Sequence, residues 1–248
     1  MNLGTPIAKG NTAKIYLYEN RIIKVFNDHL PDTESSYEAF KQKYAYSCGL
    51  SVPKILDVTK INGKQAIIME YIKGRTIGDI LSENMEQAEY YMSISVDIQQ
   101  KIHMIAGDSL EPMSEKLRRQ IESGSLDQRH KTALIQKLDM MKFEKRLCHG
   151  DYHFFNLIMS DNKVTIIDWV DSSSGDIRAD VYRTYLLYSQ ISEELAEMYL
   201  RIYCEKSGLS KDEVFEWAPI IAGARLSENV LSEKSERLIE IVNHYCPI

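Results

Sequence analysis

Short runs of apolar residues fill the first seventy positions of the chain and predict a β-sheet. Strands are expected at residues 6–8, 13–18, 21–26, 54–59 and 64–70. Asn62 and Gly63 separate the last two runs, and this pair is typical of a two-residue hairpin turn. A helix is expected from about residue 32 to residue 48, because Thr33 can cap its start and Gly49 can end it.

From residue 76 onward the apolar residues recur at every third or fourth position, which predicts helices. Helices are expected at residues 76–82, 84–105, 113–123, 127–142, 192–207, 210–229 and 232–245, with a further one opening at residue 176. Ile94, Ile98, Ile102 and Ile105 form the expected apolar stripe of the second helix. The chain therefore reads as α+β, with residues 1–72 rich in strands and residues 73–248 mainly helical.

A third hairpin is predicted in the middle of this helical part. Residues 157–159 and 164–167 are expected to be its strands, and the Ser-rich residues 171–176 behind it are expected to be a turn. Antiparallel pairing would make Asn156 and Asp168 neighbours, because one precedes the first strand and the other follows the second. An amide oxygen beside a carboxylate suits Mg²⁺. Asp151 lies on the loop that leads into this hairpin.

Lys24 stands in the middle of an apolar strand, and alternation places it on the same face as Ile22 and Phe26. A buried ammonium group needs a partner of opposite charge. Glu38, in the expected helix 32–48, is the candidate, with Glu34 as the second choice. The alternative is that Glu38 is an ordinary exposed helix charge.

The segment His149-Gly150-Asp151, followed by Asn156 and Asp168, resembles the catalytic segment of the aminoglycoside phosphotransferase and choline kinase group. These are small-molecule kinases with a protein-kinase-like fold. The resemblance implies a bilobal molecule with a small N-terminal lobe, made of an antiparallel sheet and one helix, and a larger helical C-terminal lobe. It also implies that Asp151 orients and deprotonates the acceptor hydroxyl, while Asn156 and Asp168 hold Mg²⁺ on the nucleotide phosphates.

The resemblance extends to the nucleotide-binding residues. It implies that Lys24, paired with Glu38, reaches the α- and β-phosphates. Backbone groups at the end of the 64–70 strand would bind the adenine, at Glu70, Tyr71 and Ile72. A turn between the first two strands could cradle a phosphate through its backbone amides, or be a plain hairpin turn; it contains Gly10, Asn11 and Thr12.

The helical part contains residues whose roles stay open at this stage. The resemblance favours Asp180 and Arg183 as supports for the catalytic loop, with substrate contact as the alternative. His103 reads as a structural histidine. Five residues could line an acidic cleft for an amine-bearing substrate, or lie on outer helix faces: Glu213, Glu216, Trp217, Glu228 and Glu233.

Two other functions are compatible with parts of the sequence. In an extended segment His149, Asp151 and His153 would face one side, as in a metal-dependent hydrolase. A relative without activity that binds nucleotide to regulate another process is the other alternative. The Lys24–Glu38 pair argues against the hydrolase, and the complete set of charged residues argues against the inactive relative.

Composition narrows the choice of partners. The net charge of −6 gives no indication of nucleic-acid binding, and no apolar run is long enough to cross a membrane. The four cysteines are scattered, as in a reduced cytoplasmic protein. The expected function is therefore a cytoplasmic, magnesium-dependent kinase that transfers the γ-phosphate of ATP or GTP to a small-molecule hydroxyl, on an aminoglycoside or another amine-bearing alcohol.

Overall fold

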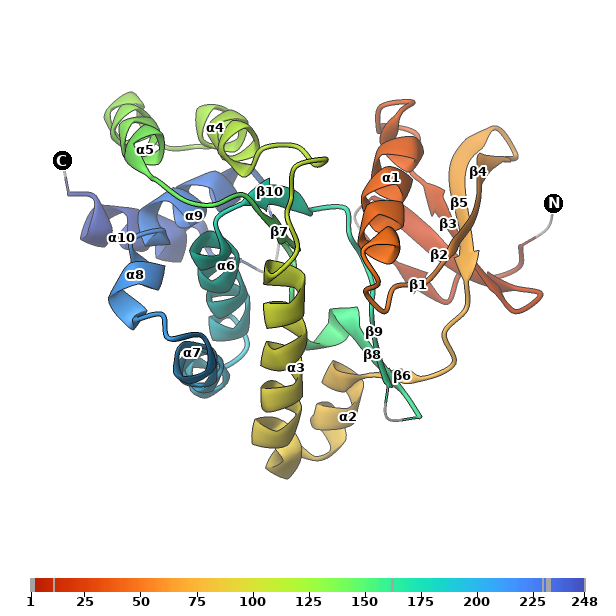
Figure 1. Ribbon diagram of the computed structural model, residues 1–248. Helices are drawn as coiled ribbons and strands as arrows, with labels where there is room; N and C mark the ends of the chain where they lie inside the picture. Colours follow the sequence, from red (N-terminus) through yellow and green to blue (C-terminus); the bar gives the residue numbers. More distant parts are fainter. Residues whose placement is uncertain (1–2, 11, 162, 229, 231–232, 248) are drawn as a thin grey trace. The chain divides into compact units, whose positions relative to one another are not determined.

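The computed structural model describes residues 3–10, 12–161, 163–228, 230 and 233–247 (Figure 1). The chain divides into two compact units. The first contains Met1–Glu83 and Phe154–Asp171, and the second contains Asn84–His153 and Ser172–Ile248. The expected boundary at residues 72 and 73 differs from this division, because the central hairpin packs with the N-terminal residues.

A five-stranded antiparallel sheet, in the order β1-β2-β3-β5-β4, forms most of the first unit. Its strands are β1 (Ala8–Lys9), β2 (Ala13–Tyr18), β3 (Arg21–Phe26), β4 (Ile55–Ile61) and β5 (Lys64–Glu70). Helix α1 (Glu34–Ser47) contacts β4 and β5. Phe26, Ala39 and Ile67 belong to the core cluster that the helix and sheet share.

Two-residue turns join the longer strands of this sheet, as the sequence predicted. Glu19 and Asn20 have φ values of 47° and 58°, and Asn62 and Gly63 have values of 50° and 83°. Both central residues of each turn therefore adopt the left-handed backbone that matches the twist of paired strands. The turns fix the registers of β2 with β3, in which Lys24 lies opposite Ile15, and of β4 with β5.

A three-stranded sheet with the order β6-β8-β9 completes the first unit. Its strands are β6 (Arg75–Thr76), β8 (Leu157–Ser160) and β9 (Lys163–Ile166), accompanied by α2 (Ile77–Glu83) and the short 3₁₀ helix η2 (Phe154–Asn156). The Thr76 hydroxyl accepts the Asp79 amide at 3.0 Å and so caps α2, as expected. Gly74 lies so close to β8 that an added Cβ would be 2.3 Å from the Met159 carbonyl oxygen.

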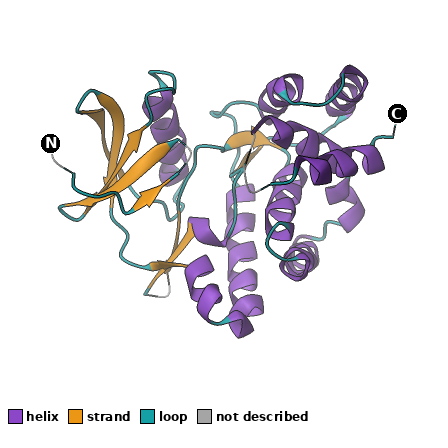
Figure 2. Cartoon of the chain, turned by 180° about the vertical axis from the view of Figure 1, so that it is seen from behind, coloured by secondary structure: helices purple, strands orange, loops and turns teal. Residues whose placement is uncertain are grey.

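The second unit is mainly helical, with a short antiparallel pair of strands (Figure 2). Its helices are α3 (Ala88–His103), α4 (Met113–Ser123), α5 (Gln128–Met140), α6 (Ile177–Ser189), α7 (Glu193–Ser207), α8 (Lys211–Phe215), α9 (Ala218–Arg225) and α10 (Ser235–Tyr245). Strands β7 (Arg146–Cys148) and β10 (Ser173–Gly175) pair, and the 3₁₀ helices are η1 (Met85–Gln87) and η3 (Leu226–Glu228). No helix in the described ranges combines the length and apolarity needed to cross a bilayer.

Three details of the helical part differ from the sequence prediction. The Ser-rich segment is not a turn, since Ser173–Gly175 forms the buried strand β10 paired with β7. The single helix expected at 210–229 is divided, because Pro219 cannot continue a helix and instead occupies the first turn of α9. The expected stripe on α3 is also wrong, since Ile94 and Ile98 are only partly buried.

Candidate active site

Lys24 lies in the interior of the five-stranded sheet, between β2 and β5, and is 8% exposed. Its ammonium nitrogen lies 2.6 Å from Glu38 Oε1 and 3.2 Å from Asp168 Oδ1. The pair with Glu38 that the sequence predicted is thus formed. Burial lowers the pKa of Lys24, but the carboxylates of Asp168 and Glu38 outweigh burial and raise that pKa above its ordinary value.

Helix α1 presents Glu38 from a buried face that is largely polar. Ser35 donates to Gln65 Oε1 through both its amide and its hydroxyl at 3.1 Å, and Gln42 donates to the Pro53 carbonyl at 2.8 Å. These bonds fix the helix on the sheet at two points along its length. Burial raises the pKa of Glu38 more than the Lys24 ammonium group lowers it, so the pKa of this carboxyl group lies above its ordinary value.

Asp168 follows β9, at the same end of the hairpin as Asn156. The Ile167 amide donates to the Asn156 carbonyl at 3.0 Å, which extends the β8–β9 pairing by one step. Asp168 has a φ of 61°, a left-handed conformation that costs an L-residue about 1–2 kcal/mol. Its side chain is 40% exposed although Oδ1 faces Lys24, so a cation in solvent can reach this carboxylate.

Lys41 is a functional candidate that the sequence analysis missed. It lies one helical turn beyond Glu38 on the buried face of α1, and its ammonium group donates to the Val170 carbonyl at 2.6 Å. The ammonium nitrogen also lies 4.2 Å from the centre of the Tyr37 ring. Helix α1 therefore holds the segment after Asp168 through the Val170 carbonyl, while Lys24 on β3 binds the Asp168 carboxylate. The i, i+3 spacing from Glu38 was the available signal.

The predicted phosphate-binding turn and adenine-binding segment also belong to the first unit. Gly10 lies in the β1–β2 turn, where its amide donates to the Ala13 carbonyl at 2.9 Å, and Thr12 accepts the Asn27 amide at 2.8 Å. Asn11 lies outside the described residues. Glu70 ends β5, three residues beyond the partner of Lys24, and Tyr71 and Ile72 follow it directly. Their roles stay predictions.

The loop that carries Asp151 lies in the second unit and is held mainly through its backbone. Gly150 has a φ of +82°, which favours glycine at this position. Asp180 accepts the His149 amide at 3.2 Å and the Gly150 amide at 2.7 Å. Arg183 donates from Nε to the Gly150 carbonyl. Asp180 and Arg183 thus support the loop, which is the first of the two roles that the sequence left open.

Asp180 is itself fixed by a buried polar network that the sequence did not reveal. His103 lies 2.9 Å from Asp180 Oδ2 through Nε2, and its Nδ1 lies 2.6 Å from the Tyr203 hydroxyl. Gln99 donates to the same carboxylate at 3.3 Å. Burial alone would raise the pKa of Asp180, but the hydrogen bond and charge of His103 outweigh it, and the pKa is lowered to about 2.

The Asp151 side chain is 27% exposed and carries a negative charge at neutral pH. Its carboxylate lies 3.5 Å from His153 Nε2. Burial favours the neutral acid, but His153, followed by Arg183 and His149, outweighs burial and holds the pKa of Asp151 well below its usual range. A carboxylate in this state can accept a hydrogen bond from a hydroxyl group.

The geometry gives little support to the metal-hydrolase alternative. His149 is fully buried, and its Nδ1 accepts the Asp151 amide at 3.3 Å, so this nitrogen is already used. Within the described part of the chain, the three residues with ligand atoms close enough to share an ion are instead His103, Cys148 and Asp180. Burial raises the pKa of Cys148 well above its usual value, which keeps it a thiol and a poor ligand.

The five residues considered for an acidic cleft do not form one. Trp217 is buried in the core, and its indole donates to Asp176 at 3.0 Å. Glu228 and Glu233 are engaged by arginines. Glu213 caps α8 through Ser210, and Glu216 is exposed near Arg178.

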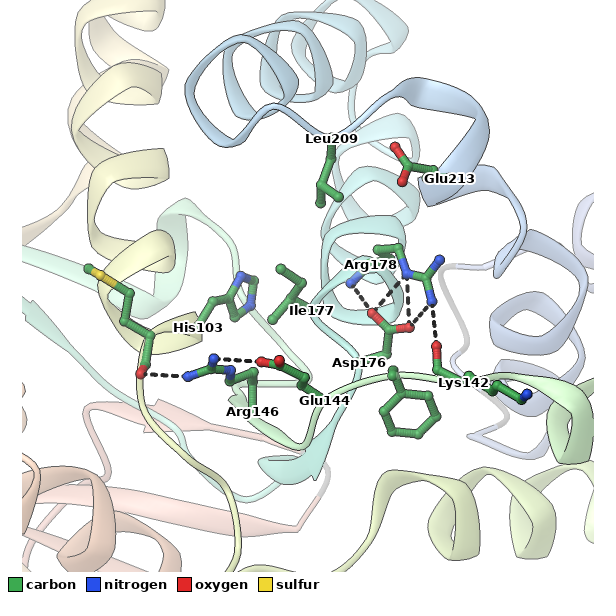
Figure 3. Close-up of a pocket in the computed structure, with 11 residues that line it drawn as sticks. His103, Lys142, Glu144, Arg146, Asp176, Ile177, Arg178, Leu209 and Glu213 are labelled. Carbon is green, nitrogen blue, oxygen red and sulfur yellow. Dashed lines mark hydrogen bonds and ion pairs between the residues drawn. The ribbon is translucent and has the colours of Figure 1, made fainter.

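A hollow of about 480 Å³ in the second unit lies beside Arg146 and the first turn of α6, and His103 and Glu213 are among its lining residues (Figure 3). None of the described catalytic, metal or nucleotide-binding candidates lines it. Its lining residues include three positive and three negative side chains, Lys142, Arg146, Arg178, Glu144, Asp176 and Glu213. Arg178 forms an ion pair with Asp176 at 2.6 Å, and Arg146 forms one with Glu144 at 2.6 Å. The hollow therefore shows no net charge that would select a ligand.

The sequence matches the model of a known protein family. The model of the phosphotransferase enzyme family matches residues 4–219. No curated protein matches the sequence significantly.

Solved structures share the fold at low sequence identity. A thermostable mutant of the aminoglycoside phosphotransferase APH(4)-Ia, in a complex with ADP and hygromycin B, has a TM-score of 0.71 at 11% identity, covering 98% of this chain and 94% of that one. A choline/ethanolamine kinase family protein from Mesorhizobium loti has a TM-score of 0.62 at 12% identity, covering 96% and 85%. Amicoumacin kinase hAmiN, in complex with AMP-PNP, Ca²⁺ and Ami, has a TM-score of 0.62 at 17% identity, covering 97% and 86%.

Proposed function

The chain belongs to the phosphotransferase enzyme family and is a small-molecule kinase, and we propose that it transfers the γ-phosphate of ATP or GTP to a hydroxyl of an amine-bearing small molecule. The observation that carries this proposal is the buried Lys24 ammonium, held between Glu38 and Asp168. Burying an ammonium group costs free energy of desolvation, so we expect this one to be kept for binding a ligand. A lysine ammonium group binds phosphate well because it acts as a compact point charge.

Lys24 has the role of holding the nucleotide phosphates in this proposal. Glu38 keeps the ammonium group charged and limits its rotation, so that little reorganisation is needed when the nucleotide binds. The turn with Gly10, Asn11 and Thr12 would contribute backbone amides to a phosphate, and the backbone of Glu70, Tyr71 and Ile72 would receive the base. The Gly10 amide already donates to the Ala13 carbonyl, so Gly10 would serve this role by leaving open space in which a phosphate can approach the backbone.

Asn156 and Asp168 are the residues that would hold Mg²⁺. The donor set fits this ion, because both supply hard oxygen atoms from one end of a hairpin and the Asp168 carboxylate is accessible. Mg²⁺, when bound, would neutralise negative charge on the phosphates. Lys24 and Lys41 fix the Asp168 segment through its carboxylate and the Val170 carbonyl, so the liganding oxygen is positioned in advance.

Asp151 would accept a hydrogen bond from the acceptor hydroxyl and take its proton as the bond to phosphorus forms. Its low pKa makes it a weak base, so its main contribution is orientation of the hydroxyl. This is sufficient for phosphoryl transfer, where the transition state is loose and the attacking oxygen needs little activation before bond formation.

An amine-bearing acceptor is supported by two observations. The chain carries a net charge of −6, which favours the approach of a cation. Neighbours in fold were solved with hygromycin B or with Ami. We place the reaction in the cytoplasm, because the four scattered cysteines are all free thiols.

An acceptor panel read by ADP or GDP release tests the proposal. The panel starts with hygromycin B and other aminoglycosides and continues with choline-like alcohols and amino-alcohols, each with ATP and with GTP. At least one acceptor should raise nucleotide turnover, and Asp151→Asn should lower that turnover by about 10²–10⁴-fold. Asp97→Asn, which removes an exposed carboxylate that binds Lys206, is the matched control. Turnover that is unchanged in Asp151→Asn would refute the assignment.

A further inference from the structure

Glu228 holds an arginine that reaches the catalytic loop. It ends the 3₁₀ helix η3, beyond the residues 4–219 that the family comparison matches. Its two carboxylate oxygens lie 2.6 Å and 3.0 Å from the two terminal nitrogens of Arg183. This is a bidentate pair, the geometry that fixes a guanidinium group in both position and plane.

The third nitrogen of the same guanidinium group is the one that binds the loop. Arg183 Nε donates to the carbonyl of Gly150, the residue before Asp151. Because a guanidinium group is rigid and planar, fixing its two terminal nitrogens also fixes the direction of its Nε–H bond. Glu228 therefore acts on the Gly150 carbonyl through one rigid group.

The carboxylate oxygens of Glu228 are occupied by donors from the protein, so they cannot also bind the amine of a substrate. Besides Arg183, it accepts hydrogen bonds from Arg225 at 2.9 Å and from Gln120 at 3.3 Å. Its side chain is 20% exposed. These two further donors fill the acceptor positions that the arginine fork leaves on the two carboxylate oxygens. The carboxylate is thus a fixed internal partner.

We propose that Glu228 is a positioning residue for phosphoryl transfer, which sets the orientation of the 149–151 loop, and so of Asp151, through Arg183. The inference rests on the proposed role of Asp151.

The loop needs both of its supports because of its backbone geometry. Asp180 binds the amides of His149 and Gly150, while Arg183 binds the carbonyl of Gly150. With φ at +82°, the glycine has no side chain to restrict it. Losing the bond on the carbonyl side frees the peptide that joins Gly150 to Asp151, although the amides remain bound to Asp180.

Hydrogen exchange at the loop tests the inference without any acceptor. In Glu228→Gln the side chain keeps its shape and loses its charge, so the Arg183 fork is weakened. The amide of Asp151, which belongs to the freed peptide, should exchange about tenfold faster than in the unmodified protein, as expected for loss of a charged hydrogen bond, while the amides of His149 and Gly150 stay bound to Asp180 and should change less. Glu197→Gln is the control, because Glu197 is a helix carboxylate of the same unit whose partners, Tyr185 and Lys211, are not partners of Glu228. It should leave exchange at the loop unchanged.

Kinetics provide the second readout. With magnesium–ATP or magnesium–GTP and water as the acceptor, Glu228→Gln should lower kcat about 10- to 100-fold. The KM for nucleotide should stay within twofold, since Lys24 and Asp168 are untouched. In an Arg183→Gln background the Glu228→Gln substitution should have little further effect on kcat, because Glu228 acts through Arg183. Glu228→Asp, which keeps the charge, should recover part of the loss.

Unchanged exchange at the loop in Glu228→Gln, or losses in kcat that multiply in the double variant, would overturn the inference and leave Glu228 with a structural role only. The proposed function fails separately, if Asp151→Asn keeps full turnover. Faster exchange at the loop in Glu228→Gln together with an unaffected Asp151→Asn would show that the loop is positioned as inferred but does not serve this chemistry, which also overturns the inference.

Discussion

At the scale of single residues, the site is built from buried charges that hold one another. Lys24 lies between two carboxylates, and Asp180 gathers donors from His103, Gln99 and the loop backbone. Each of these groups would be costly to bury alone. Glu38 shows this cost, since its Oε2 has no hydrogen-bond partner among the described groups.

Replacing Lys24 should separate its structural role from its binding role. Lys24→Met leaves Glu38 buried without a counter-charge, which should lower the free energy of unfolding by about 3–5 kcal/mol. The double variant Lys24→Met/Glu38→Leu removes both charges and should recover most of that loss. Neither variant should bind nucleotide with the original affinity. Urea unfolding and nucleotide titration measure the two effects. Recovery of nucleotide affinity in the double variant would contradict the assignment of Lys24.

The pKa of Asp180 predicts how stability depends on acid. This pKa is about 2 in the folded protein and near 3.8 in the unfolded chain, so the unfolded state takes up protons first as the pH falls. The stabilisation is complete above pH 4 and should disappear between about pH 4 and pH 2. It amounts to about 2–3 kcal/mol. The difference in unfolding free energy between the unmodified protein and Asp180→Asn, measured from pH 6 to pH 2.5, should shrink accordingly. A constant difference would show that His103 and the loop amides do not lower this pKa.

The sequence predicted those charged residues that stand out against an apolar background. Lys24 was recognisable because Ile22, Ile23 and Val25 surround it. Lys41 and Gln99 were not, because they lie on helices with many polar residues and their burial depends on partners far away in the chain. His103 was expected to be structural, as it is, but its partners could not be read from the sequence. Only the tertiary structure brings His103 to Asp180.

At the scale of elements, strands and turns were predicted more accurately from the sequence than the buried faces of helices were. Local turn residues determine a hairpin, as Asn62 and Gly63 do here. Helix α3 buries Ser95 and Gln99 in place of Ile94 and Ile98, because a polar network on α6 and α7 lies opposite. Strand β10 consists of Ser and Gly, so composition alone indicated a turn. Neither outcome can be read from hydrophobic periodicity.

Gly74 lies close to β8, so we expect the position of the β8–β9 hairpin to depend on this glycine. In Gly74→Ala the new methyl group would meet the Met159 carbonyl oxygen at 2.3 Å, so the backbone must shift. The unfolding free energy should fall by about 1–3 kcal/mol. Gly10→Ala is the control for stability, because its added Cβ meets only the Ala13 carbonyl at 3.8 Å. Its unfolding free energy should stay within about 0.5 kcal/mol of the original. Equal stability of both variants in urea unfolding would contradict the close approach.

At the scale of the whole molecule, the candidate machinery is divided between the two compact units. Lys24, Glu38, Asn156 and Asp168 belong to the first, and Asp151 with its supports belongs to the second. The fold class could be predicted from the sequence because the motif residues lie on different elements and follow one another in the order that the family shows. It did not predict that the central hairpin groups with the N-terminal residues, because this depends on pairing between β6 and β8. The acceptor is not determined by the fold either, since related folds serve different substrates.

Thermal unfolding with magnesium and nucleotide, added separately and together, tests the central claim most directly. ATP or GTP with Mg²⁺ should stabilise the unmodified protein by about 2.7 kcal/mol at a hundredfold excess over Kd, and each component alone should do less. Asp168→Asn should lose the part that depends on magnesium, while Asp57→Asn, at an exposed strand residue of the same unit, should keep it. An undiminished magnesium-dependent shift in Asp168→Asn, or no stabilisation of the unmodified protein by either nucleotide with Mg²⁺, would contradict a nucleotide site built on Lys24 and Asp168.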